Sequence, residues 1–181
     1  MQHEIAVQDD LLNENGELKH KGYSKKFLLR FNPANIRAFP FSWINRLRLK
    51  EWDYYGTTTP DVFFSVAVSH AGYLGVVFAY LIDFAARTQA SGLTLAPFGM
   101  GCDLPRTSES GDVRFQKKGI DISFVREKER RILRVEWEKF HNGQGLSASL
   151  TAHQPADMDS IVMATPIGHK GFYYKIGRAH V

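Results

Sequence analysis

The sequence predicts an all-β fold in which an antiparallel meander forms a barrel or a sandwich. Three observations support this prediction. Apolar and polar residues alternate in several successive segments after residue 62, which is the pattern of strands with one buried face. Short turns separate these segments, with no helical pattern between them. Aromatic residues make up 13% of the 181 residues, a composition that favours strands and apolar interiors.

Residues 1–61 are expected to form an irregular N-terminal arm that packs on the sheet. Asn15-Gly16 is a turn pair, and the stretch "FNPANIRAFPF" contains two prolines within eight residues. Such a stretch cannot be one long helix. Residues 42–49 are the exception, because they favour a short helix that starts at Ser42.

The β domain is expected over residues 62–174. The segment "VFFSVAVSH" is rich in β-branched and aromatic residues and reads as a strand. The apolar run from Tyr73 to Ala86 fits either a buried helix or a long strand, because periodicity alone does not type a short apolar run. Its Val, Phe, Tyr and Ile content and its flanking turn signals favour the strand, with Gly75 at a bulge or bend.

The clearest alternation follows a long loop at residues 96–111. The segments "DVRFQKK", "IDISFVR" and "ILRVEWE" each alternate with period two, and Lys118-Gly119 and a charged turn separate them. "LSASLTA" and "SIVMATPI" are expected to continue the same sheet. Together these segments predict an antiparallel meander with one solvent-exposed face.

Composition and motifs argue against several classes of function. The net charge of +4 comes from basic residues mixed with acidic ones, so no nucleic-acid partner is expected. Cys102 is the sole cysteine, which rules out an internal disulfide and a thiolate zinc site. The histidine spacing predicts no metal site. Gly99-Met100-Gly101 does not form a phosphate-binding loop, and no other cofactor motif is present.

We expect a cytoplasmic protein without an integral membrane segment. The N-terminus lacks the apolar core of a signal peptide. The longest apolar stretch is too short to span a bilayer and contains Asp83. The sequence does not specify an oligomeric state.

Several motifs resemble the family of unknown function DUF2804. The hallmark is Lys50-Glu51-Trp52-Asp53-Tyr54, followed by a Phe-Ser strand and by "YLGVVFAYLID", and "LTAHQPADMDSIVMATPIG" resembles a second block. The resemblance runs from about Gln2 to Tyr174, and it implies membership of a longer protein with no established activity. By fold-level analogy, the strand pattern is similar to the calycin-like (lipocalin-like) double barrels of the hydroxyneurosporene synthase and tocopherol cyclase group, which handle isoprenoid lipids.

The C-terminal "IGRAHV" resembles a translated sequencing adapter. Residues 175–181 are therefore expected to be a non-native tail, and the β domain is expected to be truncated before a second β unit. The last strand, residues 172–174, would then lack its next neighbour.

Asp83 is the most informative candidate for acid–base chemistry. If its segment is a strand, a lone ionised carboxylate on a buried face costs several kcal/mol, whereas burying one Val or Leu contributes only about 1.5–3 kcal/mol. Asp83 is therefore at the rim, paired, or protonated as a general acid.

Trp52-Asp53-Tyr54 admits two interpretations. In the first, the segment is a plug in which Trp52 packs and Asp53 holds a backbone amide or Arg48. In the second, Trp52 and Tyr54 contact an apolar ligand and Asp53 donates a proton. His153 is a further candidate, because "HQP" interrupts the sheet there.

Three function hypotheses follow. The first is a binding module for a lipid-like apolar small molecule, with the ligand-binding residues Trp52, Tyr54, Phe64, Val66 and Tyr80. The second is a hydratase, isomerase or cyclase that acts on such a lipid, with the catalytic residues Asp83, Asp53 and His153. The third is an interaction domain without a ligand cavity.

Overall fold

The computed structural model describes residues 3–105, 107, 110–155 and 157–177, and these are mostly β. The chain divides into two compact units. The sandwich unit comprises Leu47–Pro105 and Asp112–Ala152. The terminal unit comprises Met1–Arg46, Arg106–Gly111 and His153–Val181.

A four-stranded antiparallel sheet forms one layer of the sandwich unit. Its strands follow the chain order: β4 (Glu51–Thr58), β5 (Val62–His70), β6 (Leu74–Asp83) and β7 (Thr88–Pro97). The strand reading of the apolar run after Tyr73 is therefore confirmed. The predicted bulge at Gly75 is wrong, because Gly75 pairs in regular register with both His70 and Ala96. A glycine is needed there because a Cβ atom would lie 2.9 Å from the Cys102 Sγ.

Two strands of this sheet were not predicted. β4 lies in the region expected to be irregular, and β7 lies in a segment for which no element was expected. In both strands most of the large side chains, namely Trp52, Tyr54, Leu93 and Leu95, face outward, and Tyr55 is the large side chain that faces inward. The usual signal, with large apolar residues on the buried face, is therefore reversed.

The second layer is a five-stranded antiparallel sheet in the order β12-β11-β10-β9-β8. Its strands are β8 (Cys102–Asp103), β9 (Val113–Lys117), β10 (Ile120–Glu127), β11 (Arg130–His141) and β12 (Gln144–His153). The meander predicted over this stretch is confirmed. Inward-facing residues of β10 and β11 are buried at every second position, as a half-buried sheet requires.

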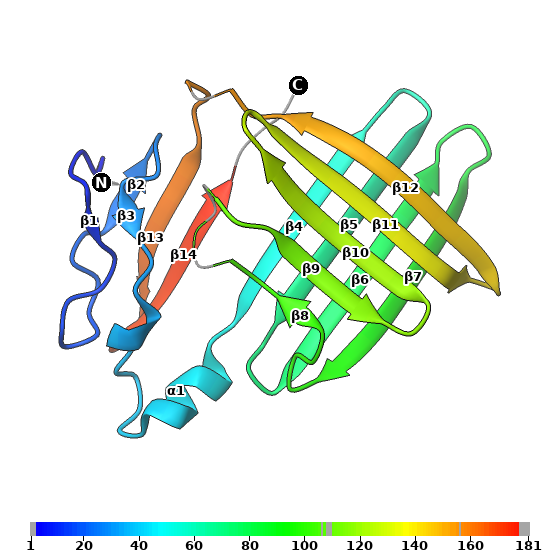
Figure 1. Cartoon of the computed structure of the whole chain (residues 1–181). Coiled ribbons are helices and arrows are strands. Elements are labelled where there is room, and N and C mark those ends of the chain that lie inside the picture. Colours follow the sequence, from blue (N-terminus) through cyan, green and yellow to red (C-terminus); the bar gives the residue numbers. More distant parts are fainter. Residues whose placement is uncertain (1–2, 106, 108–109, 156, 178–181) are drawn as a thin grey trace. The chain divides into compact units, whose positions relative to one another are not determined.

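Figure 1 shows the strands of the two sheets, and one hydrophobic core contains residues from both. Residues from both sheets are fully or nearly fully buried in it, including Val66, Val68 and Val77 from one sheet and Phe115, Ile122, Phe124 and Val135 from the other. The Tyr55 ring meets the Phe124 ring edge-on with centroids 5.1 Å apart. The described strands form two packed sheets and no closed barrel, so of the two predicted arrangements the sandwich is the one observed.

The terminal unit has its own smaller core. β13 (Ile161–Ile167) pairs with β14 (Gly171–Gly177) and with β2 (Gly22–Ser24), and β1 (Asp9–Asp10) runs parallel to β3 (Leu29–Arg30). Leu11, Leu12 and Ala164 are buried among neighbouring apolar residues. The prediction that "SIVMATPI" continues the meander is wrong, because β13 belongs to this separate sheet.

A single turn of 3₁₀ helix, η1 (Pro33–Asn35), and one short helix, α1 (Ser42–Arg48), complete the elements. The short helix predicted at residues 42–49 is confirmed. The buried Asn45 side chain accepts the backbone N–H of Phe39 at 2.9 Å and donates to its carbonyl at 3.0 Å. These two hydrogen bonds satisfy backbone groups of the chain that enters the helix.

Strand β14 extends through the first residues of the expected non-native tail. Lys175 pairs with Met163, Ile176 with Val162 and Gly177 with Ile161. This regular pairing gives no support to the expectation that the tail begins at residue 175. Residues 178–181 lie outside the described part of the chain.

Candidate functional site

The outer face of the four-stranded sheet is apolar. The strand register places Trp52, Val76 and Leu95 in one row across the sheet, and Tyr54, Phe78 and Leu93 in the next. We call this surface the aromatic face. Its large side chains are Trp52, Tyr54, Phe63, Val76, Phe78, Tyr80, Ile82, Leu93 and Leu95.

Several of these side chains are exposed where a sheet face would normally be polar. Trp52 is 50% exposed and Leu93 is 62% exposed, and Tyr54, Tyr80 and Leu95 are also exposed. Single apolar residues on a surface need no explanation, but a contiguous apolar patch indicates a place where something binds.

A row of small residues divides the aromatic face. Ser65 and Ala67 on β5 point outward between β4 and β6, yet both are buried. The ring of Tyr54 covers Gly56, because a Cβ atom at Gly56 would lie 2.8 Å from the Tyr54 Oη. Bulky rows on β4 and β6 therefore flank a narrow strip, and these rows are two strand spacings, or roughly 9.6 Å, apart.

The predicted ligand-binding residues do not line one cavity. Trp52, Tyr54 and Tyr80 lie on the aromatic face, whereas Phe64 and Val66 lie on the opposite, inner face and belong to the core. The reason is that successive side chains of a strand point to opposite faces. Tyr80 pairs with Ser65, so these two share the outer face, whereas Phe64 and Val66, on either side of Ser65, point inward. The expectation of an interior cavity lined jointly by Phe64, Val66 and Tyr80 is corrected accordingly.

Asp53 faces the interior of the sandwich unit. It pairs with Val68 on the inner face of β4, so its carboxylate points away from the side of Trp52 and Tyr54. Burial raises the pKa of Asp53 to about 6, and the charge of Arg131 and a hydrogen bond from the Tyr54 backbone partly oppose this rise. Arg131 is itself buried and donates to the carbonyl of Phe124 at 3.3 Å.

Two of the three predicted acid–base residues, Asp53 and Asp83, lie far apart on the four-stranded sheet. Asp53, Val68 and Val77 lie in one row across the sheet. Asp83 is the last residue of β6 and lies six residues beyond Val77 on that strand. Six residues of strand correspond to about 20 Å. The Asp83 Oδ1 accepts the backbone N–H of Ala86 at 2.7 Å, so this carboxylate caps the turn at the rim of the sheet. His153 belongs to the terminal unit.

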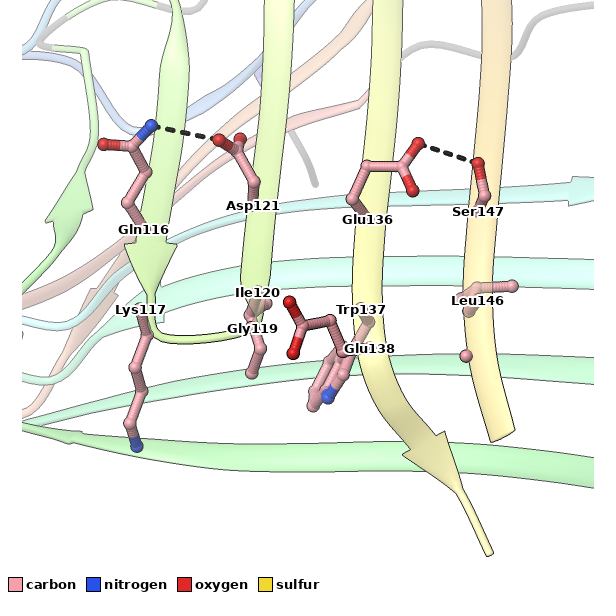
Figure 2. Close-up of a pocket in the computed structure, with 11 residues that line it drawn as sticks. Gln116, Lys117, Gly119, Ile120, Asp121, Glu136, Trp137, Glu138, Leu146 and Ser147 are labelled. Carbon is pink, nitrogen blue, oxygen red and sulfur yellow. Dashed lines mark hydrogen bonds between the residues drawn. The ribbon is translucent and has the colours of Figure 1, made fainter. Parts of the chain in front are cut away.

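A hollow of about 730 Å³ lies on the five-stranded sheet, and its lining combines polar residues with the apolar residues Ile120, Trp137 and Leu146 (Figure 2). Asp121 and Glu136 are cross-strand partners in it. Gln116 donates to Asp121 at 3.0 Å, and Ser147 donates to Glu136 at 2.7 Å. None of the predicted site residues lines this hollow. Its mixture of acidic, basic and apolar side chains does not favour the apolar ligand that the sequence suggested over a polar one.

The sequence reasoning missed Phe78, Leu93, Leu95 and Arg131. The segment "GLTLAP" contains a usable signal, because Leu93 and Leu95 alternate with Gly92, Thr94 and Ala96. The small residues face inward, since a Cβ atom at Gly92 would lie 2.6 Å from the Phe140 ring. Alternation of large and small residues, both apolar, indicates a strand whose large side chains face away from a close-packed neighbour.

No group of three or more His, Cys, Asp or Glu residues that could hold a metal ion occurs within the described residues. Among those same residues, no helix has the length and apolar character to cross a membrane.

The fold and this surface define a β-sandwich protein with one unusually apolar sheet face. The family described as "Domain of unknown function (DUF2804)" matches residues 2–178, so the chain belongs to that family. The resemblance found in the sequence is thus confirmed and covers nearly the whole chain. No curated protein and no solved structure matches, so the likeness to calycins stays a prediction.

Proposed function

We propose that the protein binds an extended, lipid-like apolar molecule and that the aromatic face is the binding surface. The observation that supports this proposal is the exposure of Trp52, Tyr54, Tyr80, Leu93 and Leu95 on one face of one sheet. Three of these five are residues that the sequence suggested as ligand contacts.

The shape of the aromatic face favours a narrow ligand. The rows on β4 and β6 are roughly 9.6 Å apart, and an α-helix with its side chains is about 10–12 Å wide. A helix is wider than this spacing, whereas an extended hydrocarbon chain is narrower and can lie along the exposed side chains of these rows. An extended peptide would bring backbone N–H and C=O groups that need partners, and apolar side chains cannot supply them.

The aromatic residues also suit a ligand with one polar end. Tyr and Trp combine an apolar ring with a polar group, so Tyr54 and Tyr80 can pack against a hydrocarbon and present a hydroxyl to a head group. Burying one such side chain contributes about 1.5–3 kcal/mol. The burial of several such side chains contributes more free energy than the lower estimates of the cost of association, about 4 kcal/mol. We therefore expect a dissociation constant in the micromolar range.

Binding of a fluorescent fatty acid to the purified chain tests the proposal. We expect Trp52→Ala combined with Leu93→Ser to weaken binding at least about tenfold, which corresponds to a loss of about 1.4 kcal/mol. The matched control is Ile161→Ser on β13, because Ile161 is 65% exposed but lies in the terminal unit. Equal affinity of the double variant and the wild type would contradict the proposal, as would capture of a protein partner but no lipid by the same face.

Acid–base catalysis is a second candidate function, and one observation favours it. Asp53 has a raised pKa near 6 and lies near a buried guanidinium, a combination common at catalytic sites. In this alternative Asp53 would act as the acid without Asp83, which lies at the rim of the same sheet. The pH dependence of any turnover of a bound lipid would have to follow the Asp53 pKa and vanish in Asp53→Asn.

A further inference from the structure

We propose that one end of the sandwich unit docks on an anionic lipid bilayer, with Tyr73, Phe98 and Met100 entering its interfacial layer. These three residues lie in the β5–β6 turn and in the β7–β8 connection, and we call them the apolar tip. They are 59%, 71% and 66% exposed, respectively. The apolar tip is distinct from the aromatic face, because it consists of turn residues and not of outward-facing strand residues.

The apolar tip is one structure and not three scattered residues. The backbone N–H of Phe98 donates to the carbonyl of Tyr73 at 2.9 Å, which joins the two connections. Within the β7–β8 connection, the N–H of Met100 donates to the carbonyl of Pro97 at 3.1 Å. The three side chains therefore project from the same end of the sandwich unit.

The backbone holds Phe98 in solvent. Phe98 has φ 53°, a left-handed conformation that Gly, Asn and Asp adopt far more readily than other residues. Its carbonyl lies 3.2 Å from the His70 Nε2, and Gly99 packs so closely on His70 that a Cβ atom would lie 1.7 Å from that ring. The contacts with His70 thus hold the backbone of the turn, while the Phe98 side chain is exposed to solvent.

The identity of Phe98 is not explained by the turn. Among described non-glycine residues with positive φ, the other four are polar: Arg87, Lys128, Asn142 and Lys170. The exposed Phe98 side chain adds no packing to the core. Gly or Asn at this position would adopt the left-handed backbone conformation at a lower conformational cost. Backbone strain of this kind indicates a functional contact when the side chain is otherwise unused.

Basic residues slightly outnumber acidic ones at the end that carries the apolar tip. This end is formed by residues 47–51, 70–75, 96–103 and 116–119, which contain the basic residues Arg48, Lys50, Lys117 and Lys118 and the acidic residues Glu51 and Asp103. The Glu138 carboxylate also lies against Gly119, and the Lys117 ammonium donates to the Leu95 carbonyl at 2.9 Å. Two contacts connect these segments. Leu47 packs against Gly72, where a Cβ atom would lie 2.0 Å from the Leu47 carbonyl oxygen, and the N–H of Gln116 donates to the carbonyl of Gly101 at 3.2 Å.

This arrangement fits an anionic bilayer better than a second copy of the chain. A symmetric contact would place the same basic residues of both copies against each other. An anionic leaflet attracts such residues, and Tyr and Phe are suited to the interfacial layer between head groups and acyl chains. A few exposed apolar side chains together with nearby basic residues supply the two signals that peripheral binding needs.

Flotation of the intact chain with vesicles tests the proposal. We expect the protein to float with vesicles of equal parts phosphatidylcholine and phosphatidylserine, and binding to weaken at least about tenfold with phosphatidylcholine alone or at high ionic strength. Phe98→Asn combined with Met100→Ser should reduce binding by a similar factor. Asn suits the left-handed backbone, so this variant retains the turn.

Two further variants make the result decisive. Ile161→Ser removes an equally exposed apolar residue from the terminal unit and should float like the wild type. In Phe98→Trp, brominated acyl chains should quench the added fluorescence if position 98 enters the bilayer. The proposal is overturned if the wild type does not float, if Phe98→Asn/Met100→Ser floats as well as the wild type, or if those two substitutions only abolish self-association.

Discussion

Replacing Asp53 by asparagine is expected to raise the free energy of unfolding at about pH 8 and to flatten its dependence on pH. Burial raises the pKa of Asp53 from 3.8 to about 6 in the folded protein. A carboxyl group with a raised folded pKa stabilises the fold fully below its unfolded pKa, and this stabilisation is lost as the pH rises through about 6. Asparagine does not ionise, so it avoids the cost of a buried charge at high pH.

The expected gain at about pH 8 is about 1–3 kcal/mol, since two pKa units correspond to about 2.7 kcal/mol and Asp53 retains some contact with solvent. Urea unfolding at a series of pH values measures it. Asp9→Asn is the contrasting control, because hydrogen bonds from Lys19 and then His20 hold the pKa of Asp9 well below its usual range. The contribution of Asp9 is therefore present above its unfolded pKa and lost as the pH falls. An unchanged pH slope in Asp53→Asn would show that Asp53 is not buried.

Replacing Phe64 by alanine is expected to destabilise the protein by about 3–5 kcal/mol, the usual cost of removing a buried phenylalanine. Phe64 is buried on the inner face of β5, where it packs in the core shared by the two sheets. The same urea titration measures the loss.

Leu93→Ala is the matched comparison on the other face of the same sheet. Leu93 is exposed, so its truncation should change the free energy of unfolding by less than about 0.5 kcal/mol while it weakens lipid binding. The reverse result, in which Phe64→Ala stays stable but loses the ligand, would return the site to the interior of the sandwich.

Much of the sandwich unit could be predicted because its strands carry period-two signals that do not depend on the rest of the fold. β9–β11 present apolar residues to one buried face, and short turns set their antiparallel order. β6 required a choice between helix and strand, and its β-branched and aromatic content was sufficient for that choice.

The missed features share one physical cause, which is that sequence reasoning assumes large apolar residues face the core. In β4 and β7 the large residues Trp52, Tyr54, Leu93 and Leu95 face outward, and apart from Tyr55 the inward positions hold smaller or polar residues such as Asp53, Gly92 and Ala96. The same assumption placed Tyr80 in the interior beside Phe64 and Val66. Only the register of β5 with β6 separates these residues onto two faces.

The membership of β13 in a separate sheet could not be read from the sequence for a related reason. "SIVMATPI" has the same alternation as the meander strands before it, and alternation does not specify a partner strand. The partner is set by long-range pairing with Gly22, Tyr23 and Ser24.

Photolabelling with a diazirine fatty acid, followed by peptide mapping of the modified residues, tests the central claim most directly. If a lipid-like ligand lies on the aromatic face, the label should attach to outward residues of the four-stranded sheet, namely Trp52, Tyr54, Tyr80, Leu93 and Leu95. Labels concentrated on inward residues such as Phe64 and Val66, with the outward residues unmodified, would contradict the account.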